Sequence, residues 1–238
     1  MNNNITIAII GAMDCEITKI KEIMQNIKEI ADKSFTLTTG NFKNLNIILA
    51  KSGVGKVNSA VCTQYICDKY SPDYIINTGV AGGIAKGLKI GDIVIGSKLV
   101  QYDFDVTALG YAKGYMCTGI NKDKPTIYYS DENLINKFIE AMKKESEANI
   151  HNGIIATADM FLSDIEKKEQ LRTEFNATAA EMEGAAIAQT ATRNNIPFLI
   201  IRAVSDLADG ETDDYVEFSE ERMAHYSSEA IKILLKNL

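Results

Sequence analysis

The sequence predicts an α/β fold in which helices cover both faces of a largely parallel or mixed β-sheet. Strand-like and helix-like patterns alternate over nearly the whole chain, and this alternation is typical of a sheet with helices on both faces. The 238 residues, of which 46% are hydrophobic and 24% charged, suffice for a substantial core. We therefore expect a single domain over residues 1–238.

The first half begins with a buried strand at residues 5–10, because ITIAII is a short continuous apolar run. Isoleucines at helical spacing then predict a helix from Asp14 to about Ile27. FTLTTGNF and LNIILAK predict a hairpin that turns near Asn44. A helix over about 55–70 ends before Pro72, and the strands DYIINTG and DIVIGSKLVQYD follow.

The second half begins with a polar stretch at about 112–124, which contains lysines and glycines without a clear period. We interpret it as a loop or lid. The helix SDENLINKFIEAMKKE follows, with Ser130 as its expected N-cap. The remaining expected elements are the strand NGIIATA, a short helix from about Ser163, a strand over 178–182, a helix over 183–193, a strand over 197–204 and a helix from about Glu217.

Composition narrows the class of ligand. The net charge is −7, which disfavours nucleic acid and anionic membranes as partners, because both require clustered positive charge. Residues 1–15 lack the features of a signal peptide, and no apolar run is long enough to cross a bilayer. Cys15, Cys62, Cys67 and Cys117 lack the spacing of a metal site or a disulfide framework. We expect a cytoplasmic protein with reduced thiols, no metal and a small-molecule ligand.

Three acidic residues follow apolar runs: Glu16, Glu183 and Asp206. Open α/β sheets bind ligands at the carboxyl ends of their strands, so these carboxylates could meet in one pocket. Asp206 and Glu183 also have structural explanations. Asp206 could cap a turn or donate a proton from a poorly hydrated pocket. Glu183, together with Glu181, could begin a surface helix or occupy a buried site among small residues.

The glycine-rich segments do not match phosphate-binding motifs. SGVGK at 52–56 lacks the first glycine of a P-loop, and Val57 stands where that motif has Ser or Thr. GAMDCE at 11–16 does not fit the dinucleotide-binding pattern, and it places acids where a pyrophosphate would lie. NTGVAGG at 77–83 follows a strand, and its glycines would serve either a close ligand or a structural turn.

Seven ordered segments together resemble the bacterial 5'-methylthioadenosine/S-adenosylhomocysteine nucleosidases, of the nucleoside phosphorylase/hydrolase superfamily. They are GAMDCEI, KSGVGKVNSA, PDYIINTGVAGG, GDIV, DVTALGY, AEMEGAAIA and IRAVSDLAD. The resemblance extends from about Ile5 to the last helix and is weakest over 112–150. It implies a three-layer α/β sandwich that hydrolyses the bond between adenine and a 5'-thio-substituted ribose, with no metal or organic cofactor.

The resemblance also implies roles for individual residues. Asp206 would protonate adenine N7, Glu16 would activate the attacking water, and Glu183 would bind the ribose hydroxyls. This division follows the logic of an inverting glycosidase. The other residues implied to contact or support the substrate are Phe161 stacking on adenine, Leu162 reading the base edge, Met182 under the ribose, Ser205 supporting Asp206, Arg202 supporting Glu183, and Val54, Val80, Ala81, Gly82 and Glu181 lining the site.

This sequence departs from the common family pattern at several positions. Val80 stands where many members have Ser. Leu109 and Cys117 stand where well-known members use Phe and Pro to complete the 5'-thio pocket of a partner subunit, so the resemblance implies a homodimer. Either Tyr215 or Val216 would match the Phe that closes over the base. These differences concern substrate preference more than reaction class.

Three other functions are weighed against hydrolysis of these nucleosides. A purine nucleoside phosphorylase needs cationic residues for phosphate, whereas the GAMDCEI loop supplies Asp14 and Glu16. An aminodeoxyfutalosine-type nucleosidase would share the acids and differ in the 5' pocket. A non-enzymatic nucleoside sensor would be expected to lose one of the three acids, and all three are present.

Overall fold

The computed structural model describes residues 5–32, 35–208 and 217–238. Its helices are α1 (Asp14–Ile23), α2 (Lys56–Tyr70), α3 (Glu132–Glu145), α4 (Ile165–Phe175), α5 (Gly184–Arg193) and α6 (Glu217–Lys236), with a 3-10 turn η1 (Thr107–Leu109). Its strands are β1 (Thr6–Gly11), β2 (Gln25–Asp32), β3 (Phe35–Phe42), β4 (Leu45–Lys51), β5 (Tyr74–Asn77), β6 (Val80–Gly83), β7 (Ile93–Gln101), β8 (Tyr128–Tyr129), β9 (Ile150–Thr157), β10 (Ala177–Glu181) and β11 (Phe198–Asp206).

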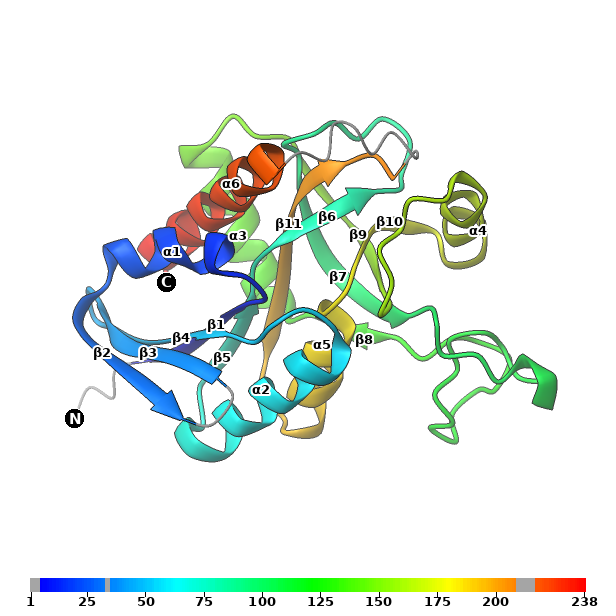
Figure 1. The fold of residues 1–238 in the computed structure, drawn as a ribbon, viewed down its shortest axis with the longest axis horizontal. Helices are drawn as coiled ribbons and strands as arrows, with labels where there is room; N and C mark the ends of the chain where they lie inside the picture. Colours follow the sequence, from blue (N-terminus) through cyan, green and yellow to red (C-terminus); the bar gives the residue numbers. More distant parts are fainter. Residues whose placement is uncertain (1–4, 33–34, 209–216) are drawn as a thin grey trace.

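The expected α/β class is confirmed: a mixed sheet lies between two layers of helices (Figure 1). Among the described residues the strands join in the order β2-β3-β4-β1-β5-β11-β6-β10-β9-β7-β8, and β11 also pairs with β7. Helices α1, α3 and α6 cover one face, and α2 and α5 cover the other (Figure 1). No helix in the described part of the chain has the length and apolar character needed to span a membrane.

Strand β1 shows why its sequence is apolar at every position. Ile7 and Ile9 pack into the core beneath α1 and α6, whereas Ala8 and Ile10 pack into the core beneath α2 and α5. Successive side chains of a strand point to opposite faces, so a strand covered on both faces needs an uninterrupted apolar run. The prediction of a buried strand at the start of the chain is therefore confirmed.

The first helix is shorter than the sequence predicts. It ends at Ile23, and the backbone of Met24 is extended. Asn26 adopts a left-handed conformation with φ of 53°, which a helix cannot continue through. The following residues form β2, which pairs antiparallel with β3. The predicted extension to Ile27 was wrong because the apolar residues of this edge strand continue a roughly helical spacing.

The predicted N-cap of α3 is also corrected. Asp131, not Ser130, caps this helix, and its side chain accepts a hydrogen bond from the Leu134 backbone N–H at 2.9 Å. The Ser130 hydroxyl instead donates to the Gly96 carbonyl at 2.6 Å. The residues just before Ser130 form the short strand β8, which the sequence did not predict. The stretch at 112–124 contains no helix or strand, as predicted, and it belongs to the long connection between β7 and β8 (Figure 1).

The centre of the sheet positions the functional residues. Strands β1, β5 and β11 are parallel neighbours, and β6 continues from β5 and pairs with the end of β11. Strand β10, however, runs antiparallel to β6. The three acids do meet, but not because the three strands before them end at one edge of the sheet. They meet because the end of β10 faces the beginning of β6.

Candidate active site

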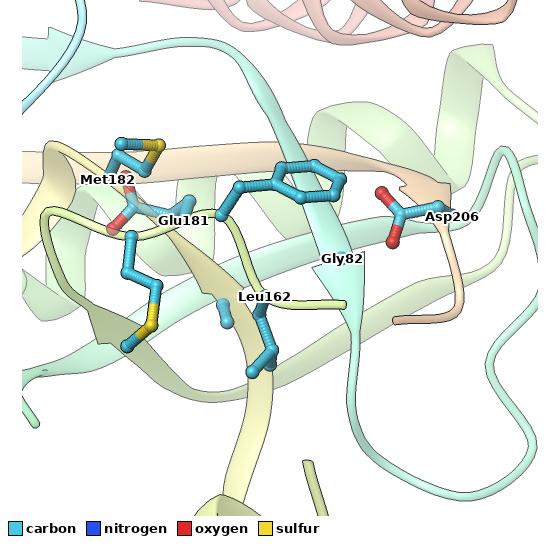
Figure 2. A pocket seen from close by; sticks show the side chains of 8 residues that line it. Gly82, Leu162, Glu181, Met182 and Asp206 are labelled. Carbon is cyan, nitrogen blue, oxygen red and sulfur yellow. The ribbon is translucent and has the colours of Figure 1, made fainter. Parts of the chain in front are cut away.

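One cleft contains all three acids that the sequence singled out. It has a volume of about 160 Å³ and is lined by Ala12, Met13, Glu16, Val54, Val80, Ala81, Gly82, Phe161, Ala180, Glu181, Met182, Glu183, Ser205 and Asp206. A smaller cavity of about 40 Å³ adjoins it and adds Met160 and Leu162 to the lining. Figure 2 shows Asp206 on one side of this cavity, with Glu181 and Met182 on the other and Leu162 between them.

Glu16 lies in the first turn of α1, directly after β1, and is 3% exposed. Its Oε2 accepts hydrogen bonds from the backbone N–H groups of Ala12 and Met13, at 2.6 and 3.1 Å. Its Oε1 accepts one from the Val80 N–H at 3.3 Å. Burial raises the pKa of Glu16, against the opposing effects of Arg202 and these N–H donors. A fixed carboxylate of raised basicity is suited to taking a proton.

Glu183 is the residue immediately before α5, and its carboxylate reaches the start of α2. The Gly55 backbone N–H donates to its Oε1 at 2.8 Å. Gly55 has a φ of 98°, a conformation that favours glycine. Burial, followed by repulsion from the Glu181 charge, raises the pKa of Glu183 to about 8. The SGVGK segment thus donates its backbone N–H to a carboxylate of the protein itself.

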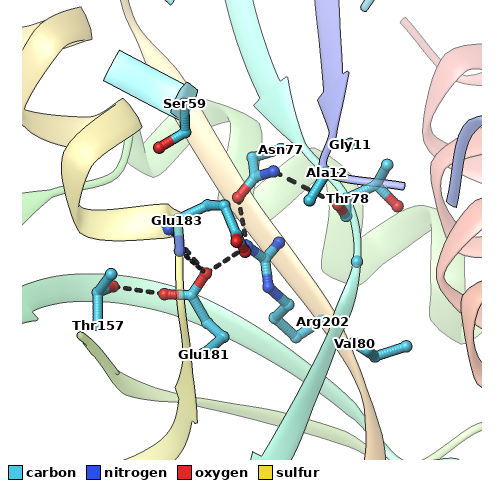
Figure 3. Close-up of polar contacts among 12 residues, drawn as sticks. Gly11, Ala12, Ser59, Asn77, Thr78, Val80, Thr157, Glu181, Glu183 and Arg202 are labelled. Atoms are coloured by element: carbon cyan, nitrogen blue, oxygen red, sulfur yellow. Dashed lines mark hydrogen bonds and ion pairs between the residues drawn. The ribbon is translucent and has the colours of Figure 1, made fainter. Parts of the chain in front are cut away.

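A buried arginine joins the acids beneath the cleft (Figure 3). Arg202 is 1% exposed, and its Nη2 donates to Asn77 Oδ1 at 2.5 Å and to Glu181 Oε2. The Glu183 carboxylate is farther away, at 3.8 Å. Burial would lower the pKa of Arg202, but the charges of Glu181, Glu183 and Glu16 raise it. Its positive charge therefore compensates a site that otherwise contains only acids.

Glu181 is the direct partner of Arg202, which the sequence had assigned to Glu183. Its Oε2 also accepts the backbone N–H groups of Glu183 and Gly184, at 3.0 and 2.7 Å. Its Oε1 accepts the Thr157 hydroxyl. Both oxygens are thus occupied by protein donors. This side chain holds the start of α5 and the guanidinium in place, and it is less available than Glu183 to a ligand.

Asp206 ends β11 at the other end of the cleft. The Ser205 hydroxyl donates to its Oδ2 at 2.8 Å, and the Ala208 N–H donates to its Oδ1 at 2.9 Å. The bond to Ala208 is the turn-capping interaction that the sequence offered as the structural explanation. The same carboxylate nevertheless lines the cleft. A register shift between Val204 and Asp206 in the pairing with β6 is the irregularity that re-aims a side chain.

Strand β6 forms the floor between the two ends. Its first residue, Val80, contacts Glu16, whereas Gly82 lies against Asp206. A Cβ added to Gly82 would be 3.1 Å from Asp206 Oδ1, so glycine lets the carboxylate lie close to the backbone. A molecule lying along β6 would have Asp206 at one end and Glu16 at the other. This arrangement can protonate a leaving group and deprotonate a nucleophile in the same cleft.

Some predicted site residues do not line the cleft. Arg202 lies behind it, and Leu109 and Cys117 are exposed on the connection between β7 and β8, with Leu109 70% exposed. Tyr215 and Val216 lie outside the described residues.

Sequence reasoning missed Ala12, Met13, Asn77, Met160 and Ala180. Two of them could have been found from motifs already quoted. Met13 lies close to Glu16 in GAMDCEI, and Asn77 begins the glycine-rich turn NTGVAGG.

Comparisons with known proteins agree with this architecture. The model of the phosphorylase superfamily matches residues 6–238. The 5'-methylthioadenosine/S-adenosylhomocysteine nucleosidase of Anoxybacillus flavithermus is 39% identical over 233 residues, covering 98% of this chain and 98% of that protein. The nucleosidase structure from Neisseria meningitidis in complex with methylthio-immucillin-A has a TM-score of 0.91 and 39% identity, and the match covers 98% of this chain and 99% of that one.

A second solved structure is similar in fold and less similar in sequence. The futalosine hydrolase of Helicobacter pylori has a TM-score of 0.92 and 30% identity, and the match covers 100% of both chains. Together with the full-length match to the superfamily, these similarities confirm the resemblance carried by the seven segments. The chain belongs to the 5'-methylthioadenosine/S-adenosylhomocysteine nucleosidases of the phosphorylase superfamily.

Proposed function

We propose that this protein hydrolyses the N-glycosidic bond of 5'-methylthioadenosine and S-adenosylhomocysteine, releasing adenine and the 5-thio-substituted ribose. The observation that carries the proposal is the placement of Glu16 and Asp206 at opposite ends of one cleft, which Glu183 also lines. Membership of the nucleosidase family supports the same substrates. An adenine nucleoside would lie along β6, with its base toward Asp206.

In the proposed mechanism, Asp206 donates a proton to adenine N7, and the electron pair of the C1'–N9 bond moves to the base. The ribose then carries positive charge at C1' and O4', which the negative charges of the Glu16 and Asp206 carboxylates stabilise electrostatically. Glu16 takes a proton from a water molecule as its oxygen bonds to C1'. Glu183 accepts hydrogen bonds from the ribose hydroxyls. Adenine leaves neutral, and the water supplies the new hydroxyl of the sugar.

Apolar residues complete the proposed substrate site. Phe161 and Met182 line the cleft and the adjoining cavity, and we assign them to stacking on the base and to contact beneath the ribose. Leu162, in the adjoining cavity, is assigned to the base edge. Val80 has no hydroxyl that could bond to Asp206, and the Ser205 hydroxyl donates a hydrogen bond to this carboxylate instead. The change from Ser to Val at this position is therefore compatible with an oriented general acid.

We also propose that the protein acts as a cytoplasmic homodimer in which Leu109 and Cys117 complete the partner's 5' pocket. Exposed apolar side chains support the dimer: Val57 and Val61 are 72% and 53% exposed on α2, and Leu109 is 70% exposed. Light scattering is expected to give a dimer, and L109D is expected to weaken it. A fully active monomer would contradict this assembly.

Two alternatives differ in the nucleophile or in the 5' group. The fold similarity to a futalosine hydrolase favours an aminodeoxyfutalosine-type substrate as the second candidate, because only the 5' substituent would change. A phosphorylase would need cationic side chains in the cleft to hold phosphate, whereas the described residues that line this cleft include no Lys, Arg or His. Adenine release from methylthioadenosine, measured with and without phosphate, tests the proposal. We expect equal rates; dependence on phosphate or absence of release would overturn it.

A further inference from the structure

Two consecutive serines of α6 are buried beside the Glu16 end of the cleft. Ser227 is 0% exposed and Ser228 is 1% exposed. Neither lines the cleft, and neither belongs to the segments that identified the family. Neighbouring residues of a helix point in directions about 100° apart, so the two hydroxyls reach different parts of the fold. Both of these parts contact Glu16.

Ser228 contacts Glu16 itself. The Ser228 hydroxyl donates to the backbone carbonyl of Glu16 at 2.9 Å, joining residues at opposite ends of the chain. This bond fixes the main chain of α1 at the residue that carries the carboxylate. The carboxylate side of Glu16 is held by the N–H groups of Ala12, Met13 and Val80. Ser228 therefore sets where the Glu16 side chain starts, whereas the N–H groups set where it ends.

Ser227 contacts the turn between β5 and β6. Its Oγ accepts the Gly79 backbone N–H at 3.1 Å and lies 2.7 Å from the Thr78 hydroxyl. Gly79 precedes Val80, whose N–H donates to Glu16 Oε1. A Cβ added to Gly79 would lie only 2.5 Å from that same Oε1. The turn thus lies directly against the Glu16 carboxylate, and a small movement of the turn would move it.

We propose that Ser227 and Ser228 are positioning residues that fix Glu16 for activation of the attacking water. Through them α6 holds the two elements that orient this carboxylate, α1 and the β5–β6 turn, in one geometry. The inference rests on the proposed function of the cleft, because it takes Glu16 as the general base. It assigns to α6 a part in catalysis although neither serine lines the cleft.

Loss of either hydroxyl is expected to change the position of the Glu16 carboxylate. Removing Ser227 Oγ leaves the buried Gly79 N–H without its partner, which favours movement of the turn. A displacement of about 1 Å at a reacting group can reduce a rate by about a hundredfold. Binding of the nucleoside in its ground state depends on the base and ribose contacts, which these serines do not touch. The rate of the chemical step should therefore fall while binding stays.

The test is steady-state hydrolysis of methylthioadenosine by S227A and S228A. We expect kcat to fall about 10- to 100-fold, with KM within about threefold of wild type. S228C separates packing from hydrogen bonding, because a thiol fills nearly the same space and is a weak donor. We expect S228C to be impaired like S228A. Recovery of wild-type kcat in S228C would show that only volume matters and would overturn the proposal.

S130A is the matched control. Ser130 is also buried, and its hydroxyl also donates to a backbone carbonyl, that of Gly96, away from the cleft. We expect S130A to lose a similar amount of thermal stability while keeping its kcat. An equal fall of kcat in S130A, or wild-type kcat in folded S227A and S228A, would overturn the positioning role.

A second readout separates this inference from the proposed function. The ionisation of Glu16 can be followed by NMR with labelled glutamate carboxyls in the absence of substrate. We expect its midpoint to shift in S227A and S228A and to stay in S130A; an unchanged midpoint in both serine variants would contradict positioning. Wild-type protein that releases no adenine would overturn the proposed function, and this titration would still decide whether the serines hold the carboxylate.

Discussion

Glu16 and Asp206 lie at opposite ends of strand β6, which forms the floor of the cleft between them. The Val80 N–H donates to Glu16 Oε1 at 3.3 Å, and Gly82, two residues later, lies against Asp206. The two carboxylates differ in surroundings: Glu16 is enclosed by backbone donors, whereas Asp206 is bonded to a hydroxyl and one N–H. This difference matches the proposed division into a base and an acid.

Asp206→Asn is predicted to reduce kcat by about 10²- to 10⁴-fold, because an amide cannot supply the acidic proton. The fold should be intact, since the Asn oxygen can still accept the Ala208 N–H. Adenine release and a thermal melt measure the two effects. S205A is the companion variant, and it should lose less activity because it disturbs only the orientation of the acid. Near-normal turnover of the Asn variant would refute the role of Asp206.

Glu16→Gln should also slow the chemical step by about 10²- to 10⁴-fold. The amide oxygen can replace Oε2 and keep the bonds from Ala12 and Met13, and only the longer 3.3 Å bond from the Val80 N–H to Oε1 is lost, so the fold should tolerate the change. Calorimetric titration with a non-hydrolysable nucleoside analogue should give a dissociation constant within about threefold of wild type. Loss of binding with an unchanged single-turnover rate is the outcome that this assignment does not allow.

Arg202→Ala is predicted to destabilise the protein by about 3–5 kcal/mol, because it leaves Glu181 and its neighbours as uncompensated buried charges. Urea unfolding measures the change. Arg193→Ala is the control: Arg193 is exposed in the last turn of α5, and its loss should cost less than about 0.5 kcal/mol. If both variants unfold at similar urea concentrations, the buried network does not hold this part of the fold together.

Glu183 should make stability depend on pH. Burial and the Glu181 charge raise its pKa from 4.5 to about 8, so the folded protein favours the protonated form. The resulting stabilisation is full below about pH 4.5 and is lost as pH rises toward 8, with a slope of at most about 1.4 kcal/mol per pH unit. Urea unfolding of wild type and E183Q between pH 5 and 8.5 compares the slopes. The free energy of unfolding should fall more steeply with pH in wild type; identical slopes would contradict the raised pKa.

The sequence predicted the central strands because β1 and β11 are covered on both faces, and such strands read as unbroken apolar runs. It also predicted that Glu16, Glu183 and Asp206 share a cleft, but the reason it offered, that the strands before them end at one edge of the sheet, does not hold for β10. Strand β10 is antiparallel to β6, and nothing local in AAEMEGAA encodes that direction. The same limit applies to the pairing of Arg202 with Glu181, which depends on the register between β10, β6 and β11 and so on tertiary contacts.

Local sequence patterns gave wrong predictions where the same pattern of residues is compatible with two different local structures. Residues after Ile23 continue an approximately helical recurrence of isoleucine, yet they form β2 because β3 offers them a partner. Ser130 and Asp131 are both good caps, and only the pairing of the first with the Gly96 carbonyl decides between them. The two serines of α6 carry no motif at all; their contact with the Glu16 end of the cleft is visible only in the folded chain.

The most direct test of two opposed carboxylates with water as the nucleophile is hydrolysis of methylthioadenosine in H₂¹⁸O, without phosphate, followed by mass spectrometry of the sugar. We expect adenine and a thioribose that carries ¹⁸O at C1 in the first turnover. We also expect phosphate to change neither the product nor the rate. A sugar 1-phosphate, or a release of adenine that requires phosphate, would contradict it.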